Sequence, residues 1–163
     1  MKRRTRTLVF LVCAAALLGA AVFAELRRER ALALDPLTTL DLAAATRVEV
    51  TCAGCAARHY RKVDAHWRQR DPDAPADEAF VARLLAIAHA PVRVRYPAHD
   101  FDPARIGLVP PLATLRIDDA ELRFGATDAI RGDRYVAVGD AVALVPDRFS
   151  ALLFKAAAPS QKE

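Results

Sequence analysis

The chain has few of the residues from which catalytic sites are usually built. It contains only two serines, Ser150 and Ser160, and neither lies in a G-x-S-x-G nucleophile elbow. The four histidines lack the HExxH spacing of metalloproteases, and the six glycines form no phosphate-binding loop. We therefore expect no catalytic residues, no bound cofactor and no enzymatic activity.

Excess positive charge is also lacking outside the N-terminus, although the whole chain has a net charge of +4. Residues 1–30 hold seven of the 24 Lys and Arg residues and two of the 20 Asp and Glu residues. The remainder carries 17 basic and 18 acidic residues, a net charge of −1. Because nucleic-acid binding needs a basic surface, the sequence predicts no nucleic-acid partner.

An uncharged run of 18 residues, 7–24, follows the basic residues at the start of the chain. As a helix it would be about 27 Å long, close to the roughly 30 Å of a bilayer core. It also lacks the polar stripe of a helix that packs on a soluble core. Residues 1–30 are therefore predicted to be a cytoplasmic basic stub and a single-pass anchor in a bacterial inner membrane. The basic flank places the N-terminus in the cytoplasm and the following domain in the periplasm.

A cleaved signal peptide is the alternative to this anchor. Cleavage after Ala24 is acceptable, because Val22 and Ala24 are a branched and a small residue at the recognised positions. The apolar run is longer than the usual signal-peptide core of about 7–15 residues, which favours the anchor. Cys13 lies within the run and is read as one of its apolar residues.

The remaining sequence predicts an α+β domain with a mostly antiparallel sheet over residues 47–154. A connector over 31–46 precedes it, and a disordered tail over 155–163 follows it. Alternating polarity predicts strands at 47–51, 58–70 and 92–96, and two later hairpins that turn at 118–120 and 139–140.

One main helix is predicted at about 77–90. Asp77 is a good N-cap, and Pro91 ends the helix. Its apolar face consists of residues that recur at helical spacing: Phe80, Val81, Leu84, Leu85 and Ala88. Short helices are expected near 103–107 and 147–154, each after an Asp that can serve as its N-cap.

Two stretches of this domain are distinctive: GL-x-PP from Gly107 to Pro111, and FG…G-x-RYV from Phe124 to Val136. With the order of the surrounding segments, they resemble the domain-of-unknown-function 4340 family of bacterial envelope proteins over about residues 37–150. The resemblance implies an envelope accessory domain with a protein partner, associated with an envelope or ABC-type transport assembly. It implies no catalytic residues.

The stretch VTCAGCAARH places Cys52 three residues before Cys55, and His59 follows four residues later. Two thiolates could bind a soft ion such as Cu(I), and His59 and His66 could complete a loosely spaced zinc site. The pair could also exchange disulfides. Covalent haem attachment is discounted, because it needs a histidine directly after the second cysteine.

A structural interpretation of the same pair competes with these. Residues at the two ends of a β-turn lie within about 7 Å, which overlaps the Cα separations of disulfides. Because Cys52 and Cys55 are expected between two strands, we favour a structural disulfide or two unreactive thiols over chemistry. The sequence thus predicts a non-enzymatic, membrane-anchored accessory domain. A thiol-based redox or soft-metal-binding protein that uses Cys52, Cys55 and His59 is the alternative.

Overall fold

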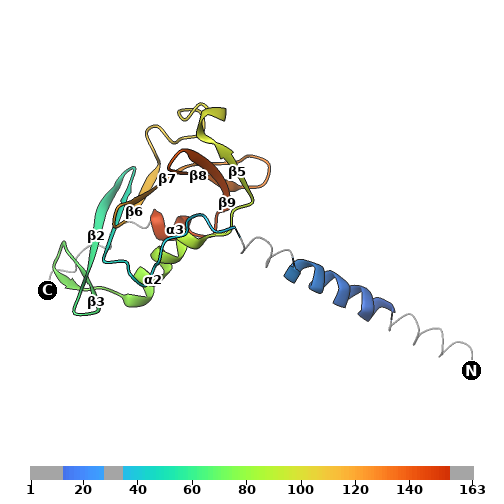
Figure 1. Ribbon diagram of the computed structural model, residues 1–163, viewed down its shortest axis with the longest axis horizontal. Coiled ribbons are helices and arrows are strands. Elements are labelled where there is room, and N and C mark those ends of the chain that lie inside the picture. The colour runs from blue at the N-terminus through green and yellow to red at the C-terminus, as the bar shows by residue number, and fades with distance from the viewer. Residues whose placement is uncertain (1–12, 28–34, 155–163) are drawn as a thin grey trace, which may run out of the picture. The chain divides into compact units, whose positions relative to one another are not determined.

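The computed structural model describes residues 13–27 and 35–154, and it divides the chain into two compact units with a boundary between Asp35 and Pro36 (Figure 1). In the first unit, residues 13–27 form a helix. Within the described ranges, no helix has both the length and the apolar character needed to cross a membrane. The first half-dozen residues of the predicted anchor, the basic stub and the predicted tail lie outside the described residues.

The second unit is built on one antiparallel sheet of nine strands, as expected for the predicted α+β class. Their order across the sheet is β4-β3-β2-β1-β6-β7-β8-β9-β5. The strands are β1 (Arg47–Cys52), β2 (Cys55–Val63), β3 (His66–Gln69), β4 (Ala74–Pro75), β5 (Val94–Pro97), β6 (Ala113–Ile117), β7 (Ala120–Thr127), β8 (Asp133–Val138) and β9 (Ala141–Pro146). The first hairpin and the later hairpins are joined where β1 pairs with β6.

The main helix lies where the sequence predicts it. Helix α2 (Glu78–Ala86) begins after Asp77, whose Oδ1 accepts a hydrogen bond from the backbone N–H of Phe80 at 3.1 Å. This bond satisfies one of the N–H groups that have no partner in a first helical turn. A 3₁₀ turn, η1 (Ile87–His89), continues the helix towards Pro91, which cannot extend it.

The two predicted short helices need correction. Residues 103–107 form consecutive turns and no helix, and Gly107 at their end adopts a φ of +70°, which redirects the chain. A 3₁₀ turn that the sequence does not predict, η2 (Ala98–Asp100), precedes them. The helix expected over 147–154 is shorter, since α3 is limited to Ser150–Leu153.

The folded unit also starts earlier than predicted. Leu37 is buried, and its backbone N–H donates to the carbonyl of Ala90 at 2.9 Å. This bond satisfies a carbonyl at the C-terminal end of the helical segment, where the helix itself supplies no partner. The predicted connector over 31–46 is therefore corrected, because from Pro36 onward it belongs to the folded unit.

One predicted strand is a hairpin. Residues 58–70 contain the end of β2 and all of β3, which are joined by Asp64 and Ala65 with φ values of 50° and 66°. Two successive positive φ values are typical of the type I′ turn, which usually contains Asn-Gly or Asp-Gly. Because Asp-Ala is not one of these usual sequences, the sequence does not predict this turn. The predicted turn at 139–140 between β8 and β9 is confirmed.

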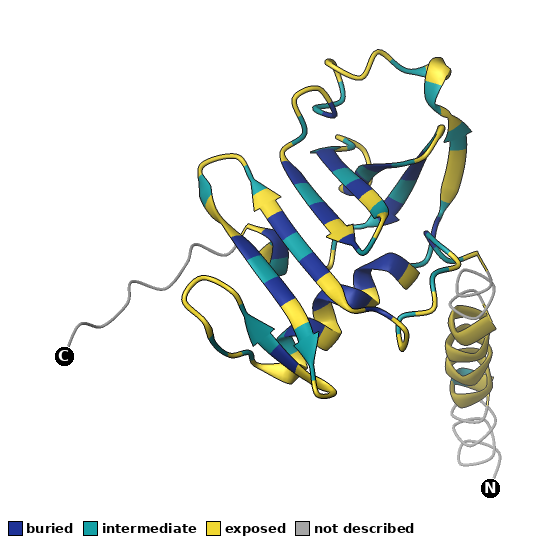
Figure 2. Ribbon diagram, turned by 60° about the vertical axis from the view of Figure 1, so that its left-hand side comes forward, coloured by how far each residue is buried: buried dark blue, intermediate teal, exposed yellow. Residues whose placement is uncertain are grey.

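The inward-facing residues of the sheet form the main core together with α2 and α3 (Figure 1). Along β1, Val48 and Val50 are buried while the residues between and beside them are more exposed, and Leu115 and Ile117 repeat this alternation on β6 (Figure 2). Such a period of two is expected for strands with one buried face. Helix α2 contributes Leu84, which is fully buried.

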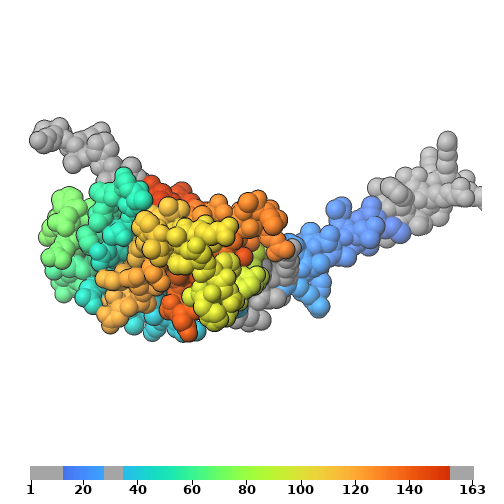
Figure 3. Space-filling view, turned by 90° about the horizontal axis from the view of Figure 1, so that it is seen from above, coloured from blue at the N-terminus to red at the C-terminus, as the bar shows by residue number. Residues whose placement is uncertain are grey.

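The opposite face of the sheet, which we call the outer face, is only partly covered. A second, small core joins Leu108 to Val142 on β9, so that residues 98–108 lie over part of this face (yellow in Figure 3). Their close approach requires Gly125 on β7, because a Cβ atom there would lie 2.2 Å from the carbonyl oxygen of Ile106. Outward-facing side chains of β1, β2 and β6 keep contact with solvent.

Replacing Leu84 by Ala is expected to lower the free energy of unfolding by about 2–5 kcal/mol, because it leaves a cavity in the main core. Arg83→Ala is the matched control, since Arg83 lies on the exposed side of the same helix. Chemical denaturation followed by the fluorescence of the single tryptophan, Trp67, measures both changes. Equal denaturation midpoints for the wild type and Leu84→Ala would contradict the assigned inner face.

Candidate functional site

The cysteine pair lies at the tip of the β1–β2 hairpin. Cys52 and Cys55 are cross-strand partners, and the chain reverses between them through Ala53 and Gly54, with a φ of +77° at the glycine. The two cysteines form a disulfide with a Cα–Cα separation of 5.4 Å, within the range that disulfides usually show. Both are half-buried.

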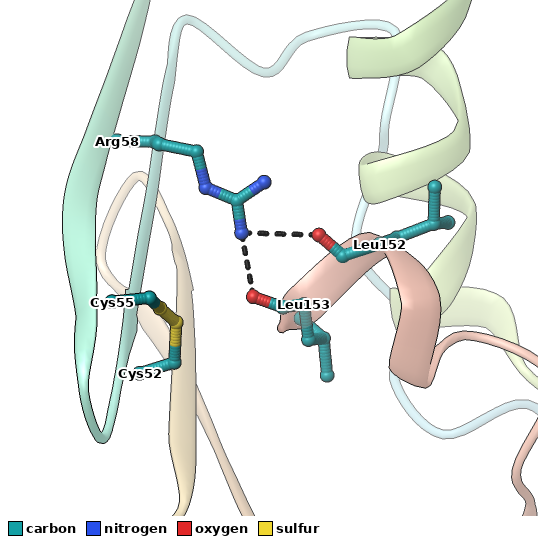
Figure 4. Close-up of a disulfide and its surroundings, with 5 residues drawn as sticks. All are labelled: Cys52, Cys55, Arg58, Leu152 and Leu153. Atoms are coloured by element: carbon teal, nitrogen blue, oxygen red, sulfur yellow. Dashed lines mark hydrogen bonds between the residues drawn. A yellow bond between two sulfur atoms is a disulfide. The ribbon is translucent and has the colours of Figure 1, made fainter. Parts of the chain in front are cut away.

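An irregularity in the strand register determines which face the disulfide occupies. Val50 pairs with Arg58, but two residues later Cys52 pairs with Cys55, so β2 contains one extra residue. Such a bulge lets Cys55 lie on the same face as Arg58 and Cys52, although simple alternation along β2 would place it on the opposite face. Figure 4 shows the disulfide and the Arg58 side chain on the same side of the hairpin, which faces α3.

The histidines of the predicted metal sites do not join the cysteines. His59 is on the outer face, where its Nδ1 lies 3.5 Å from Oε1 of Glu49. His66 lies at the start of β3, with its Nδ1 3.6 Å from Oε1 of Glu78. Within residues 13–27 and 35–154, no three His, Cys, Asp or Glu side chains are placed to hold a metal ion together.

A buried arginine that the sequence analysis missed lies beside the disulfide. Arg58 is 7% exposed, and its Nη2 donates to the carbonyls of Leu152 at 3.0 Å and Leu153 at 2.6 Å (Figure 4). A cation at a helix C-terminus is favourable, because the last carbonyls lack partners there. Burial lowers the pKa of Arg58 from its ordinary value. Its position two residues before the inward-facing Tyr60 on β2 was the available signal.

A second buried arginine holds the other end of α3. The Arg134 Nη2 lies 2.7 Å from Oδ2 of Asp147 and donates to Oγ of Ser150 at 2.8 Å. Asp147 Oδ1 also accepts a hydrogen bond from the backbone N–H of Ser150 at 3.2 Å. Burial tends to raise the pKa of Asp147, but the hydrogen bonds from Arg134 and Ser150 outweigh burial and hold that pKa below its ordinary value. The side chains of Arg134, Asp147 and Ser150 thus occupy one another's hydrogen-bonding groups. We therefore assign these three residues a structural role.

An open cleft of about 780 Å³ lies on the outer face. It extends across β2, β1 and β6 to the turn that joins β6 to β7, and these strands lie beside the yellow segment in Figure 3. Its lining is mostly charged: Arg47, Val48, Glu49, His59, Tyr60, Arg61, Arg70, Asp73, Arg116, Asp118, Asp119 and Glu121.

Charged residues of both signs alternate across the centre of this cleft. Glu49 on β1 is the cross-strand partner of His59 on one side and of Arg116 on the other. Arg116 is in turn the partner of Glu121, and its Nη2 lies 2.6 Å from the Glu121 carboxylate. Opposite charges in register stabilise neighbouring strands. The surface therefore offers fixed charges and hydrogen-bonding groups for binding.

Comparison with known proteins found no relative of this chain. Neither a scan against family models nor searches of curated proteins and solved structures found a match. The resemblance to the domain-of-unknown-function 4340 family therefore stays a prediction. The two stretches on which it rests contact each other, because Gly125 lies against the chain at Gly107 and Leu108.

Replacing both Cys52 and Cys55 by Ser is expected to lower the free energy of unfolding by about 1–3 kcal/mol while leaving the fold intact, because the closed loop is very short. Unreduced, denatured wild-type protein should expose one reactive thiol, that of Cys13, and reduction should expose three. Cys13→Ser is the matched control. Three reactive thiols before reduction would contradict the disulfide.

The stability of the fold is expected to fall steeply as the pH drops below about 4. The pKa of Asp147 is depressed in the folded state, so its charge stabilises the fold above its unfolded pKa, and this contribution is lost as the pH falls through the folded pKa. Asp147→Asn should flatten this part of the pH profile, whereas Asp119→Asn, at a fully exposed side chain, should not. Identical acid-unfolding profiles for wild type and Asp147→Asn would contradict the role of this carboxylate.

Proposed function

We propose that this chain is a membrane-tethered domain of the bacterial envelope that binds a protein partner and catalyses no reaction. The observation that carries the proposal is the Cys52–Cys55 disulfide at the tip of the first hairpin. Disulfides persist in oxidising compartments such as the periplasm and are rare in the cytosol. The disulfide thus supports the same orientation as the basic residues that precede the apolar run.

The proposed tether is the apolar run over residues 7–24. Its described part is helical, and its whole length as a helix would be about 27 Å, which nearly matches the hydrocarbon core of a bilayer. The folded unit begins at Pro36, only a short linker after the end of the run. A tether of this kind keeps the domain at the periplasmic surface of the inner membrane.

The binding role is supported by the outer face. Part of this face is covered by residues 98–108, while another part carries the charged cleft. Interaction surfaces of non-obligate complexes have polar rims and are enriched in arginine, and the cleft contains arginines on several strands. The envelope or transport assembly that the sequence resemblance implies would supply the partner.

A thiol-based redox or soft-metal function through Cys52 and Cys55 is the alternative. It has less support, because His59 lies on the opposite face of the sheet. The cysteines also lie in a hairpin, where no helix N-terminus stabilises a thiolate. Tight Cu(I) binding by the reduced wild type that the double Cys→Ser variant lacks would favour this alternative.

The full-length chain is expected to stay in the membrane fraction after washes with high salt and with carbonate, because neither releases a spanning helix. Protease added to spheroplasts should digest the folded unit, which would lie outside the inner membrane. Deletion of residues 7–24 is the matched control and should remove the chain from the membrane fraction. A soluble periplasmic form that begins at Glu25 would contradict the tether.

A further inference from the structure

Three arginines stand side by side on the outer face. Arg47 on β1 is the cross-strand partner of Arg61 on β2, and Arg61 is the partner of Arg68 on β3. Directly opposite residues in antiparallel strands have Cα atoms about 4.5–5.5 Å apart. We call these three residues the arginine row. Arg47 and Arg61 line the cleft, and so does Arg70, which follows Arg68 by two residues; Arg68 itself is not among the lining residues.

This arrangement costs stability, because like charges directly opposite one another are destabilising. Carboxylates offset this repulsion only at the two ends of the row. Arg68 Nε lies 3.1 Å from Asp73, and Arg47 Nη2 lies 3.7 Å from Asp119. Among the described residues, no carboxylate lies within ion-pair distance of Arg61, the central member. Arg61 is exposed and lines the cleft.

The electrostatics of Asp73 agree with a local excess of positive charge. A hydrogen bond from Arg68 lowers the pKa of Asp73, and the charges of Arg68 and Arg61 lower it further. Asp73 forms its ion pair with Arg68 alone, and Arg61 acts on it only through its charge from beyond ion-pair distance. Uncompensated charges that cost stability are common at binding sites, where the ligand provides the missing partner.

The rest of the cleft restricts what the ligand can be. Beyond the arginine row, the turn between β6 and β7 adds the acidic residues Asp118 and Asp119, and the start of β7 adds Glu121. A uniform polyanion, such as a nucleic acid or a phosphate-rich glycolipid, would be repelled at that end. A protein surface can present acidic side chains to the arginines and basic ones to the turn, which complements the cleft.

We propose that the arginine row, with Arg61 at its centre, binds acidic side chains of the partner protein. Arginine is suited to this, because its guanidinium group forms paired hydrogen bonds with a carboxylate. The inference rests on the proposed function, since it assigns the surface through which the tethered domain holds its partner. The acidic end of the cleft then sets the orientation of the bound partner.

The test uses the purified full-length chain in an uncharged detergent and a fluorescein-labelled peptide with four consecutive glutamates. Fluorescence anisotropy should show binding that weakens when NaCl is raised from about 50 mM to about 300 mM, because salt screens exposed charges. Arg61→Glu should weaken binding by about tenfold or more, since it places a carboxylate against the carboxylates of the peptide. Arg105→Glu makes the same charge change on an exposed loop outside the cleft and should leave binding within about twofold.

Three results would overturn the proposal. The first is equal weakening by Arg61→Glu and Arg105→Glu, which would show a response to net charge alone. The second is displacement of the peptide by inorganic pyrophosphate at lower concentrations than by free glutamate peptide, which would assign phosphate instead. The third is no binding of the peptide by the folded wild type at the lower salt concentration.

A second variant separates binding from structure. Arg61→Thr removes the central like charge and places a good strand former in β2, so its Tm should be unchanged or higher while peptide binding weakens. A lower Tm with unchanged binding would show that Arg61 is structural. Failure of peptide binding in a chain that keeps its membrane retention would overturn this inference alone, whereas loss of membrane retention with intact peptide binding would overturn only the tether.

Discussion

The short helix α3 is held to the sheet by a guanidinium group at each end, and the main core depends on this. Arg58 binds the carbonyls at its C-terminus, and Arg134 holds Asp147 and Ser150 at its N-terminus. Four residues are too few for a helix to be stable alone. With both ends fixed, the helix buries Leu153 completely against the inner face. The two arginines thereby replace the packing that a longer helix would provide.

Because α3 is held against the inner face, the two faces of the sheet have different roles. Helices α2 and α3 pack on the inner face, while residues 98–108 cover the part of the outer face that β7, β8 and β9 form. The uncovered part of the outer face therefore does not have to be apolar, and it carries opposite charges in register around Glu49 and like charges around Arg61. Stability and recognition are thus assigned to opposite sides of the same strands.

Local signals in the sequence located the main helix and most of the strands, but they did not locate the site. Asp77 and Pro91 delimit the main helix because capping and chain termination are properties of single residues. The turn at Asp64 and Ala65 was missed because its residues are unusual for its geometry. The bulge that separates Cys55 from His59, and the alignment of Arg47 with Arg61, depend on strand pairing. Pairing is a long-range property that a single sequence does not encode in any short segment.

The two outermost strands, β4 and β5, have a consequence for how another molecule can approach. Both are short, and both contain a proline, Pro75 and Pro97, which has no N–H to donate to an added strand. Proline at a sheet margin is one of the devices by which proteins resist edge-to-edge aggregation. Extension of the sheet by an incoming peptide is therefore disfavoured at either margin. Binding of a partner is therefore expected to use side chains on the outer face. Single substitutions there can change the affinity for the partner without exposing strand edges that would promote aggregation.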